Sequence, residues 1–268
     1  MFNFQDEFYD ASADYRRGSP HLLHRRLNEA LLEVLQRELA RLKAMGLPLT
    51  VLEVGAGHGD FTAAVLAAGC NVTAIEMSRA SLDLLCKRFE TNDAFRGVLS
   101  PDGSIQDTDT NYSMLLCASV LLHIPDYLPF LETAVSRIVP GGTLLCLQDP
   151  LFYERVPTRT RGFERVAYGA WRVRQGNLRQ AFATWRRRRR GVLDEQILAD
   201  MVEYHVVRNG VDEEAVERQL SMNFKCTEVV RYWSAHLSLG QIVGERLGLE
   251  NTFAVIARDH ILAPDAIT

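Results

Sequence analysis

Short apolar runs alternate with helix-forming segments along residues 49 to 150, and this alternation restricts the fold more than any other feature. The apolar runs have the β-branched and aliphatic content of strands: LTVLEV, NVTAIEMS, FRGVLS, YSMLLCAS and GTLLCLQDP. The segments between them have helical composition: FTAAVLAAG, SLDLLCKRFETN and DYLPFLETAVSRIV. Because the strands are apolar on both faces, the pattern predicts an α/β fold with a mainly parallel sheet covered by helices.

The alternation lapses from about residue 151 to 224 and resumes as CTEVVRYWSA, SLGQIVGERLG and TFAVIARD, which have strand, helix and strand character. The lapse therefore indicates a helical insertion within one sheet domain. Before the first strand, HLLHRRLNEALLEVLQRELARLKAMG spaces its leucines by three and four, as in an amphipathic helix. We expect an N-terminal helical lid (1–47), a core (48–150), an inserted helical cap (151–224) and the final strands and helix of the core (225–268).

Length and composition favour a soluble, cytoplasmic protein. With 268 residues and 47% hydrophobic content, the chain can bury one large core, or one core plus a cap. A net charge of −4 argues against a chain that is basic throughout, as many nucleic-acid binders are. The acidic start MFNFQDEFYD lacks a signal-peptide pattern, and no apolar run approaches the ~20 residues that span a bilayer.

The five cysteines are scattered, mostly in apolar runs, and form no CxxC pair. This spacing predicts buried free thiols in a reducing compartment, without a disulfide framework or a metal site. They are Cys70, Cys86, Cys117, Cys146 and Cys226.

A glycine-rich loop follows the first strand, in the stretch VLEVGAGHGDF at residues 51–61. Gly55, Gly57 and Gly59 permit positive φ and the close approach of a bound group to the backbone. The dinucleotide fingerprint places its third glycine at relative position six, where this chain has Asp60. A phosphate-binding P-loop requires Gly-Lys-Ser/Thr, and no lysine lies nearby.

Two acids accompany this loop. Glu76 ends the second strand 21 residues after Gly55, where one βαβ unit places an acid that accepts hydrogen bonds from ribose hydroxyls. Glu53 lies two residues before Gly55 and is suited to a cationic or amine-bearing group rather than to a pyrophosphate.

This ExGxGxG stretch with Glu76 resembles motif I and the ribose-binding acid of the class I, Rossmann-like S-adenosylmethionine-dependent methyltransferases. YSMLLCASVLLHIPD (112–126) is similar to the segment that runs from strand four into the next helix in this family. RIVPGGTLL (137–145) resembles the family's Pro-Gly-Gly turn before strand five. The resemblance covers about residues 50–150 and implies a seven-stranded sheet whose last strand is antiparallel. One departure is Ser113, at a position where the family often has Asp.

The resemblance also implies a set of cofactor-binding residues. The loop backbone would face the methionine and ribose, Glu53 the amino group, Glu76 the ribose, and Met77 the adenine ring. Tyr15, in a segment that resembles the family's opening Tyr-Asp…Tyr, would fold over the carboxylate. The full set is Tyr15, Glu53, Gly55, Ala56, Gly57, Glu76, Met77, Asp102, Gly103, Cys117, Ala118 and Ser119. Asp102 and Gly103 would contact the adenine amino group, and Cys117 to Ser119 would line the methionine end, although Cys117 also suits a purely packing role.

Arginine is concentrated at the start of the insertion. Residues 151–190 contain twelve arginines and two glutamates, a charge of +10, while the rest of the chain totals −14. Three accounts remain open for this segment, including its run of five at 186–190: a solvated face paired with acidic neighbours, a site for an anionic acceptor, or an RNA-binding surface. Successive helical residues turn by ~100°, so at most two or three of the five could reach one pocket.

Two histidines are candidate proton-transfer groups. His123, in LLHIPD, falls where the family often has a histidine that shapes the pocket. His205 shares a predicted helical face with Ile197 and Met201 and would act as a base only if that face lines the cap; otherwise it is a packing histidine.

Together these features and the resemblance imply a methyltransferase that uses S-adenosylmethionine, releases S-adenosylhomocysteine and methylates a small molecule, plausibly in specialised metabolism. An RNA methyltransferase, and a protein that binds the cofactor without transferring methyl, are the alternatives. We expect acceptor recognition in the N-terminal helices and the insertion.

Overall fold

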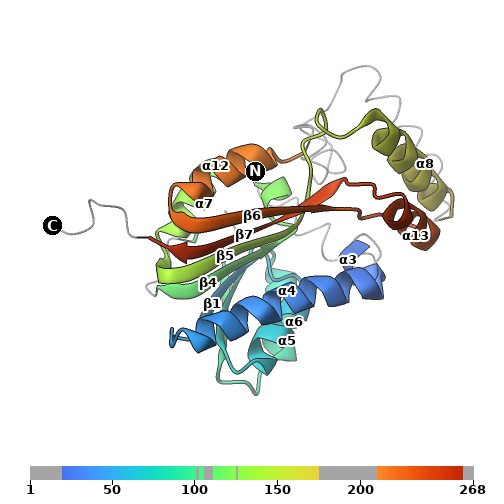
Figure 1. Cartoon of the computed structure of the whole chain (residues 1–268). Helices are drawn as coiled ribbons and strands as arrows, with labels where there is room; N and C mark the ends of the chain where they lie inside the picture. Colours follow the sequence, from blue (N-terminus) through green and yellow to red (C-terminus); the bar gives the residue numbers. More distant parts are fainter. Residues whose placement is uncertain (1–19, 101–102, 106–110, 125, 175–209, 262–268) are drawn as a thin grey trace.

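The computed structural model describes residues 20–100, 103–105, 111–124, 126–174 and 210–261. In this part of the chain, seven strands form one sheet in the order β3-β2-β1-β4-β5-β7-β6 (Figure 1). The strands are β1 (Thr50–Val54), β2 (Asn71–Glu76), β3 (Phe95–Leu99), β4 (Tyr112–Ala118), β5 (Ile138–Pro150), β6 (Phe224–Tyr232) and β7 (Thr252–His260). β7 runs antiparallel to both β5 and β6, and the pairs among β1 to β5 are parallel. The predicted fold class is confirmed.

Helices cover both faces of this sheet. One face carries α4 (Arg25–Ala44) and α5 (Asp60–Ala67), and the other carries α7 (Tyr127–Val135) and α12 (Glu213–Ser221) (Figure 1). The remaining described helices are α3 (Pro20–Leu23), α6 (Arg79–Arg88), the short 3₁₀ turn η1 (Leu121–His123), α8 (Thr158–Arg174) and α13 (Ser238–Arg246). None of the described helices is long and apolar enough to cross a membrane.

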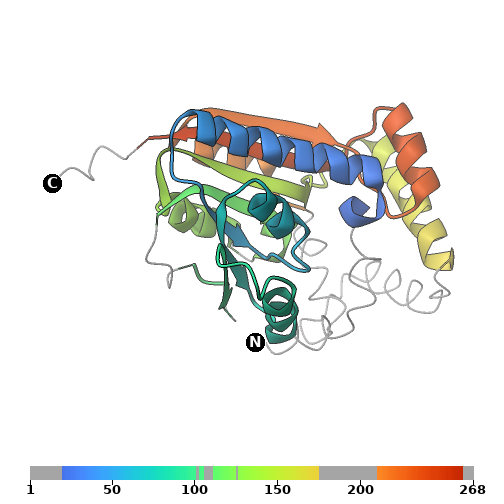
Figure 2. The same ribbon diagram turned by 90° about the horizontal axis from the view of Figure 1, so that it is seen from below.

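The predicted N-terminal helix is α4, which packs along the sheet (Figure 2). Its leucines form one buried stripe because they recur at helical spacing: Leu27, Leu31, Leu35, Leu39 and Leu42. Glu38 is also buried and receives a two-pronged ion pair from Arg258 of β7, with N–O distances of 2.8 to 3.0 Å. The lid function expected of residues 1–47 stays a prediction, and residues 1–19 lie outside the described part.

The Pro-Gly-Gly motif differs from its expected place. It lies inside β5, which begins at Ile138, rather than in a turn before the strand. Ile138 pairs with Tyr112 and Thr143 with Met114, so the pairing shifts across the motif. Gly141 takes a φ of +80°, which few other residues adopt readily, and this allows the irregularity.

The insertion leaves and rejoins the sheet at neighbouring residues. Leu151 forms an isolated parallel bridge with Val211, and the Val211 N–H donates to the Pro150 carbonyl at 3.0 Å. After this point α8 lies against α13 beyond the carboxyl ends of the strands, where Phe163 meets Trp233 with ring centroids 5.6 Å apart (Figures 1 and 2). By contrast α12, also within residues 151–224, packs on β6, β7 and α7.

The cysteines are free thiols, as expected, but two of them are not buried. Cys70, Cys117 and Cys146 lie in the core. Cys86 and Cys226 are exposed, because they lie on helix α6 and on the edge strand β6, whose side chains are mostly open to solvent.

Candidate functional site

The described residues of the predicted cofactor site lie at or near the carboxyl ends of the parallel strands. The strand order reverses between β1 and β4, since β2 and β3 lie on one side of β1 while β4 and β5 lie on the other. In open α/β sheets, ligands bind beside the carboxyl ends of strands at such a switch point. The glycine loop follows β1, and Ser119 follows β4.

The glycine loop depends on left-handed backbone at three positions. The φ angles of Gly55, Gly57 and Gly59 are +69°, +54° and +78°. A Cβ atom on Gly55 would lie 2.8 Å from Cγ2 of Val120, so the loop and the segment after β4 touch at this residue. A Cβ atom on Gly59 would lie 2.7 Å from Leu85, which fits a role of Gly59 in packing α5 against α6.

Glu53 is only 2% exposed and contacts the start of α5. Its Oε2 accepts a 2.6 Å hydrogen bond from the hydroxyl of Thr62, a partner that the sequence analysis missed. The pKa of Glu53 is raised to about 8, mainly by burial; the Thr62 hydrogen bond opposes this rise, and the nearby carboxylates of Glu76 and Asp60 add to it. Binding of a cofactor amino group by Glu53 stays a prediction.

Glu76 ends β2 and is 8% exposed. Burial raises its pKa to about 7, against the lowering effect of a hydrogen bond from the Gly57 backbone. Glu76 and the glycine loop are therefore in direct contact. Binding of the cofactor ribose by Glu76 stays a prediction.

Met77 and Gly103 lie next to each other beyond β2 and β3. A Cβ atom on Gly103 would be 3.6 Å from the Met77 sulfur. Gly103 is placed by a turn in which its N–H donates to the Ser100 carbonyl at 3.0 Å. Asp102 lies outside the described residues.

The three residues predicted at the end of β4 have different environments. Cys117 is fully buried between β1 and β5. Ala118 is partly buried, and Ser119 has a φ of +57°, an uncommon value for a residue other than glycine. The Ser119 N–H donates to the Leu147 carbonyl at 2.8 Å and its hydroxyl to the Gln148 carbonyl at 3.1 Å, which links the ends of β4 and β5.

Gln148 and Asp149 at the end of β5 were missed by the sequence analysis. Cys146 pairs with Val255 and Asp149 with Phe253, so three steps along β5 match two along β7, as in a β-bulge. Gln148 takes a φ of +64° within this bulge. A Gln-Asp pair at the end of an otherwise apolar strand was the available signal.

Gln148 is held by side chains of β6 and the residues after it. Its N–H donates to the Tyr232 hydroxyl at 3.0 Å, and that hydroxyl donates to Oε1 of Gln148 at 3.1 Å. Its Nε2 donates to the hydroxyl of Ser234 at 2.6 Å. These contacts stabilise a backbone conformation that glutamine otherwise avoids.

Asp149 is completely buried on the α7 side of the sheet. Its Oδ1 accepts the N–H of Leu122 at 3.1 Å, and the N–H of Leu121 also bonds the carboxyl group. Among the described residues, its Oδ2 has no hydrogen-bond partner. Burial raises the pKa of Asp149 to about 7.

Of the remaining predicted residues, His123 lies in the described part of the chain. His123 ends η1 and is partly buried. Tyr15, His205 and the arginine run 186–190 lie outside the described residues.

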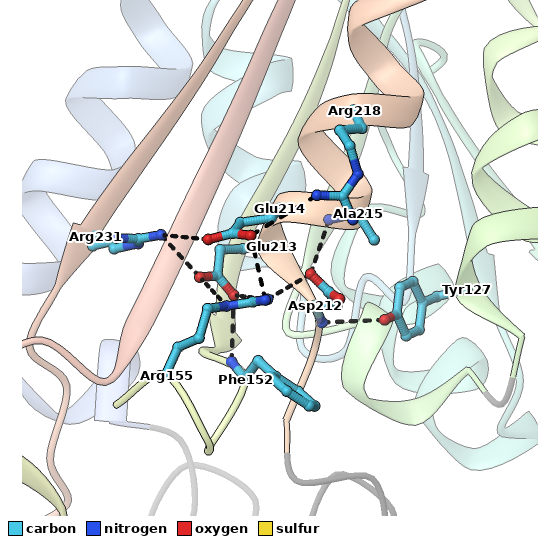
Figure 3. Close-up of polar contacts among 9 residues, drawn as sticks. All are labelled: Tyr127, Phe152, Arg155, Asp212, Glu213, Glu214, Ala215, Arg218 and Arg231. Atoms are coloured by element: carbon cyan, nitrogen blue, oxygen red, sulfur yellow. Dashed lines mark hydrogen bonds and ion pairs between the residues drawn. The ribbon is translucent and has the colours of Figure 1, made fainter. Parts of the chain in front are cut away.

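Some of the described arginines at the start of the insertion bond to neighbouring groups. Arg155 contacts Asp212, Glu213 and Glu214 at the start of α12, and the buried Glu213 also binds Arg231 at 3.0 Å (Figure 3). Arg165 donates to the Tyr153 hydroxyl at 2.7 Å. For Arg155 this supports the account of charges paired with acidic neighbours.

The strand order, the antiparallel β7 and the glycine loop beside Glu76 define the Rossmann-like fold of the class I methyltransferases. The chain belongs to the family described as Methyltransferase domain, whose model matches residues 22–190.

The chain is similar to curated proteins named ubiquinone biosynthesis O-methyltransferase. It is 28% identical to one from Actinobacillus pleuropneumoniae serotype 7 over 147 residues, 52% of this chain and 60% of that protein. It is 26% identical to one from Rickettsia conorii over 125 residues, 47% of this chain and 41% of that protein. The chain thus spans about half of the length of these relatives.

A solved structure of a geranyl diphosphate methyltransferase in complex with S-adenosylmethionine has a similar fold. The TM-score is 0.53 at 13% identity, over 87% of this chain and 86% of that one. This likeness concerns the fold.

Proposed function

We propose that this chain binds S-adenosylmethionine and transfers its methyl group to a small-molecule acceptor. The observation that carries the proposal is the contact between Glu76 and the backbone of Gly57 at the switch point of the sheet. The left-handed φ angles of the three glycines shape the loop, and Glu76 lies beside it, where its carboxyl group would accept hydrogen bonds from the ribose.

The described residues fit this cofactor. Glu76 would accept the ribose hydroxyls, and Met77 with Gly103 would border the adenine. Ser119 and the glycine loop would lie beside the methionine part of the cofactor. Glu53 would lie near its amino group. Tyr15 and Asp102 remain predicted members of the site.

The chemistry is then divided between cofactor and protein. S-adenosylmethionine supplies a reactive methyl group when bound, so the protein's task is to align the acceptor and to exclude water. We propose a hydroxyl acceptor, because the relatives are named O-methyltransferases. A hydroxyl group must lose its proton, and His123 and His205 are the proposed bases.

The insertion and the N-terminal helices are the proposed acceptor-binding parts. α8 and α13 stand beyond the carboxyl ends of the strands, on the side where the proposed cofactor site opens (Figure 1). The interleaved Tyr168 and Trp171 of α8 contact each other and His236, with ring centroids 4.4 to 5.9 Å apart, and offer an apolar and aromatic wall.

Methyl-labelled S-adenosylmethionine tests the function. The purified protein is incubated with the label and either a small-molecule extract or total RNA, with Glu76→Ala as the control that should lose the signal. We expect label in the small-molecule fraction. Label in RNA alone would support the RNA alternative, and tight binding of S-adenosylhomocysteine without any transfer would support a non-transferring binder.

A further inference from the structure

The carboxyl group of Asp149 lies at a position where an acidic side chain is unusual. It is fully buried on the apolar face of the sheet that carries Leu121 and Phe253, and burial of a carboxyl group there is costly unless hydrogen bonds compensate it. The bulge at Gln148 is the cause of this placement. Without the extra residue, a side chain three positions after Cys146 would point to the opposite face of the sheet.

The bonds of Asp149 show what this placement achieves. Its Oδ1 accepts the N–H of Leu122, and the carboxyl group also accepts the N–H of Leu121; these N–H groups at the start of η1 have no partner within so short a helix. Asp149 therefore acts as an N-cap supplied from another strand, and it joins the end of β5 to the segment after β4.

That segment in turn touches the glycine loop. Val120, immediately before η1, lies against Gly55 so closely that a Cβ atom there would be 2.8 Å from it. Ser119, one residue earlier, has a left-handed backbone and is bonded to Leu147 and Gln148 of β5. A continuous set of contacts thus leads from Asp149 through η1 and Val120 to Gly55.

We propose that Asp149 is a positioning residue of the methyl-transfer site, which holds the turn Leu121–His123 so that Val120 keeps the glycine loop in its cofactor-binding shape. The proposal rests on the proposed function. Asp149 need not touch the cofactor: it acts through η1, and it also fixes the position of His123 at the end of that turn.

Three variants separate positioning from general stability. Asp149→Leu keeps the branching at Cγ, with a larger side chain, but cannot accept the two hydrogen bonds. Asp149→Asn keeps an acceptor oxygen for them. Glu38→Gln is the control, because it weakens a buried ion pair on the α4 face, remote from η1.

Affinity for S-adenosylhomocysteine, measured by titration calorimetry well below the melting temperature, is the first readout. We expect Asp149→Leu to bind at least tenfold more weakly than the parent, Asp149→Asn within threefold, and Glu38→Gln within twofold despite a lower melting temperature. Equal affinity in folded Asp149→Leu and parent would overturn the proposal.

Amide hydrogen exchange without ligand is the second readout, and it keeps the two proposals distinct. Asp149→Leu should speed exchange in residues 119–124 and in the glycine loop 55–59, while Glu38→Gln should not. If the parent binds no S-adenosylhomocysteine, the proposed function fails, yet the exchange result still decides whether Asp149 positions the loop. Should Asp149→Leu not fold, Asp149→Ala replaces it in both measurements.

Discussion

Three carboxyl groups near the carboxyl ends of the strands share one physical property. Burial raises the pKa of Glu53 to about 8 and those of Glu76 and Asp149 to about 7. Perturbed acids of this kind cluster at functional sites, because a fold keeps them buried only where surrounding contacts compensate. Each has one anchor in the protein: Thr62, the Gly57 backbone and the turn η1, respectively.

Glu76→Ala should weaken the binding of S-adenosylhomocysteine. The loss of hydrogen bonds to two ribose hydroxyls is expected to cost about 1–3 kcal/mol, roughly a 5- to 150-fold change in dissociation constant. Titration calorimetry measures it, and Glu90→Ala after α6 is the matched control on an exposed acid. An unchanged affinity would remove Glu76 from the site.

Asp149→Asn should change the pH dependence of stability. Because the pKa of Asp149 is raised in the fold, its folded state favours the neutral acid; this contribution is fully present below about pH 4 and is lost as pH rises to about 7. The variant should therefore gain stability relative to the parent between pH 5 and 8, by up to about 4 kcal/mol for a shift of about three pKa units. Urea unfolding of both proteins across this range measures the difference.

The difference in unfolding free energy between the variant and the parent reports the titration of Asp149 rather than that of its neighbours. Tyr232 of β6 and Cys146 of β5 interact electrostatically with it, and both are present in the two proteins. A difference in unfolding free energy that does not vary with pH would show that Asp149 ionises as freely as an exposed aspartate.

At the level of elements, most of the sheet could be predicted, because strands that are apolar on both faces need helices on both sides. The two irregularities of β5 could not be predicted. The Gln-Asp pair marks the end of the strand as unusual, but the bulge itself depends on Tyr232 and Ser234, more than 80 residues further along the chain. The contact of Glu53 with Thr62 is local, but one acid and one threonine are too common a pair to signal a bond.

The glycine loop needs its third glycine for packing. In Gly59→Ala the new methyl group would meet Leu85 and Phe89 at 2.7 Å, and the left-handed φ of +78° adds strain. We expect a loss of about 1–3 kcal/mol in unfolding free energy, measured with urea.

A second substitution separates the two causes. Leu85→Ala removes one of the clashing side chains, so Gly59→Ala should be less harmful in that background than in the parent. If the two effects simply add, the clash with Leu85 is not the cause, and the contact with Phe89 or the strain of φ explains the glycine.

On the scale of the whole molecule, long-range ion pairs join parts that sequence patterns treat as separate. Glu38 on α4 binds Arg258 on β7, and Glu213 on α12 binds Arg155 after β5 and Arg231 on β6. The sequence shows that residues of both charges are present, but it does not predict which of them form ion pairs. It also placed α12 within the range of a cap, although Val216 and Leu220 of this helix lie in the main core.

Glu213→Ala should destabilise the protein through the ion-pair group of Figure 3. Glu213 is 1% exposed and holds two guanidinium groups as well as the Phe152 N–H, so its removal is expected to cost about 1–3 kcal/mol. The freed arginines are partly exposed and can turn to water, which limits the loss. Urea unfolding measures it, with Glu217→Ala on the same helix as the control; equal effects would contradict the role of Glu213.

The bridge between Leu151 and Val211 has a further consequence. An inserted segment whose two ends lie side by side can be lengthened, shortened or replaced without changing the distance between the strands that flank it. The length and sequence of such a segment can therefore change during evolution while the sheet and the glycine loop stay the same.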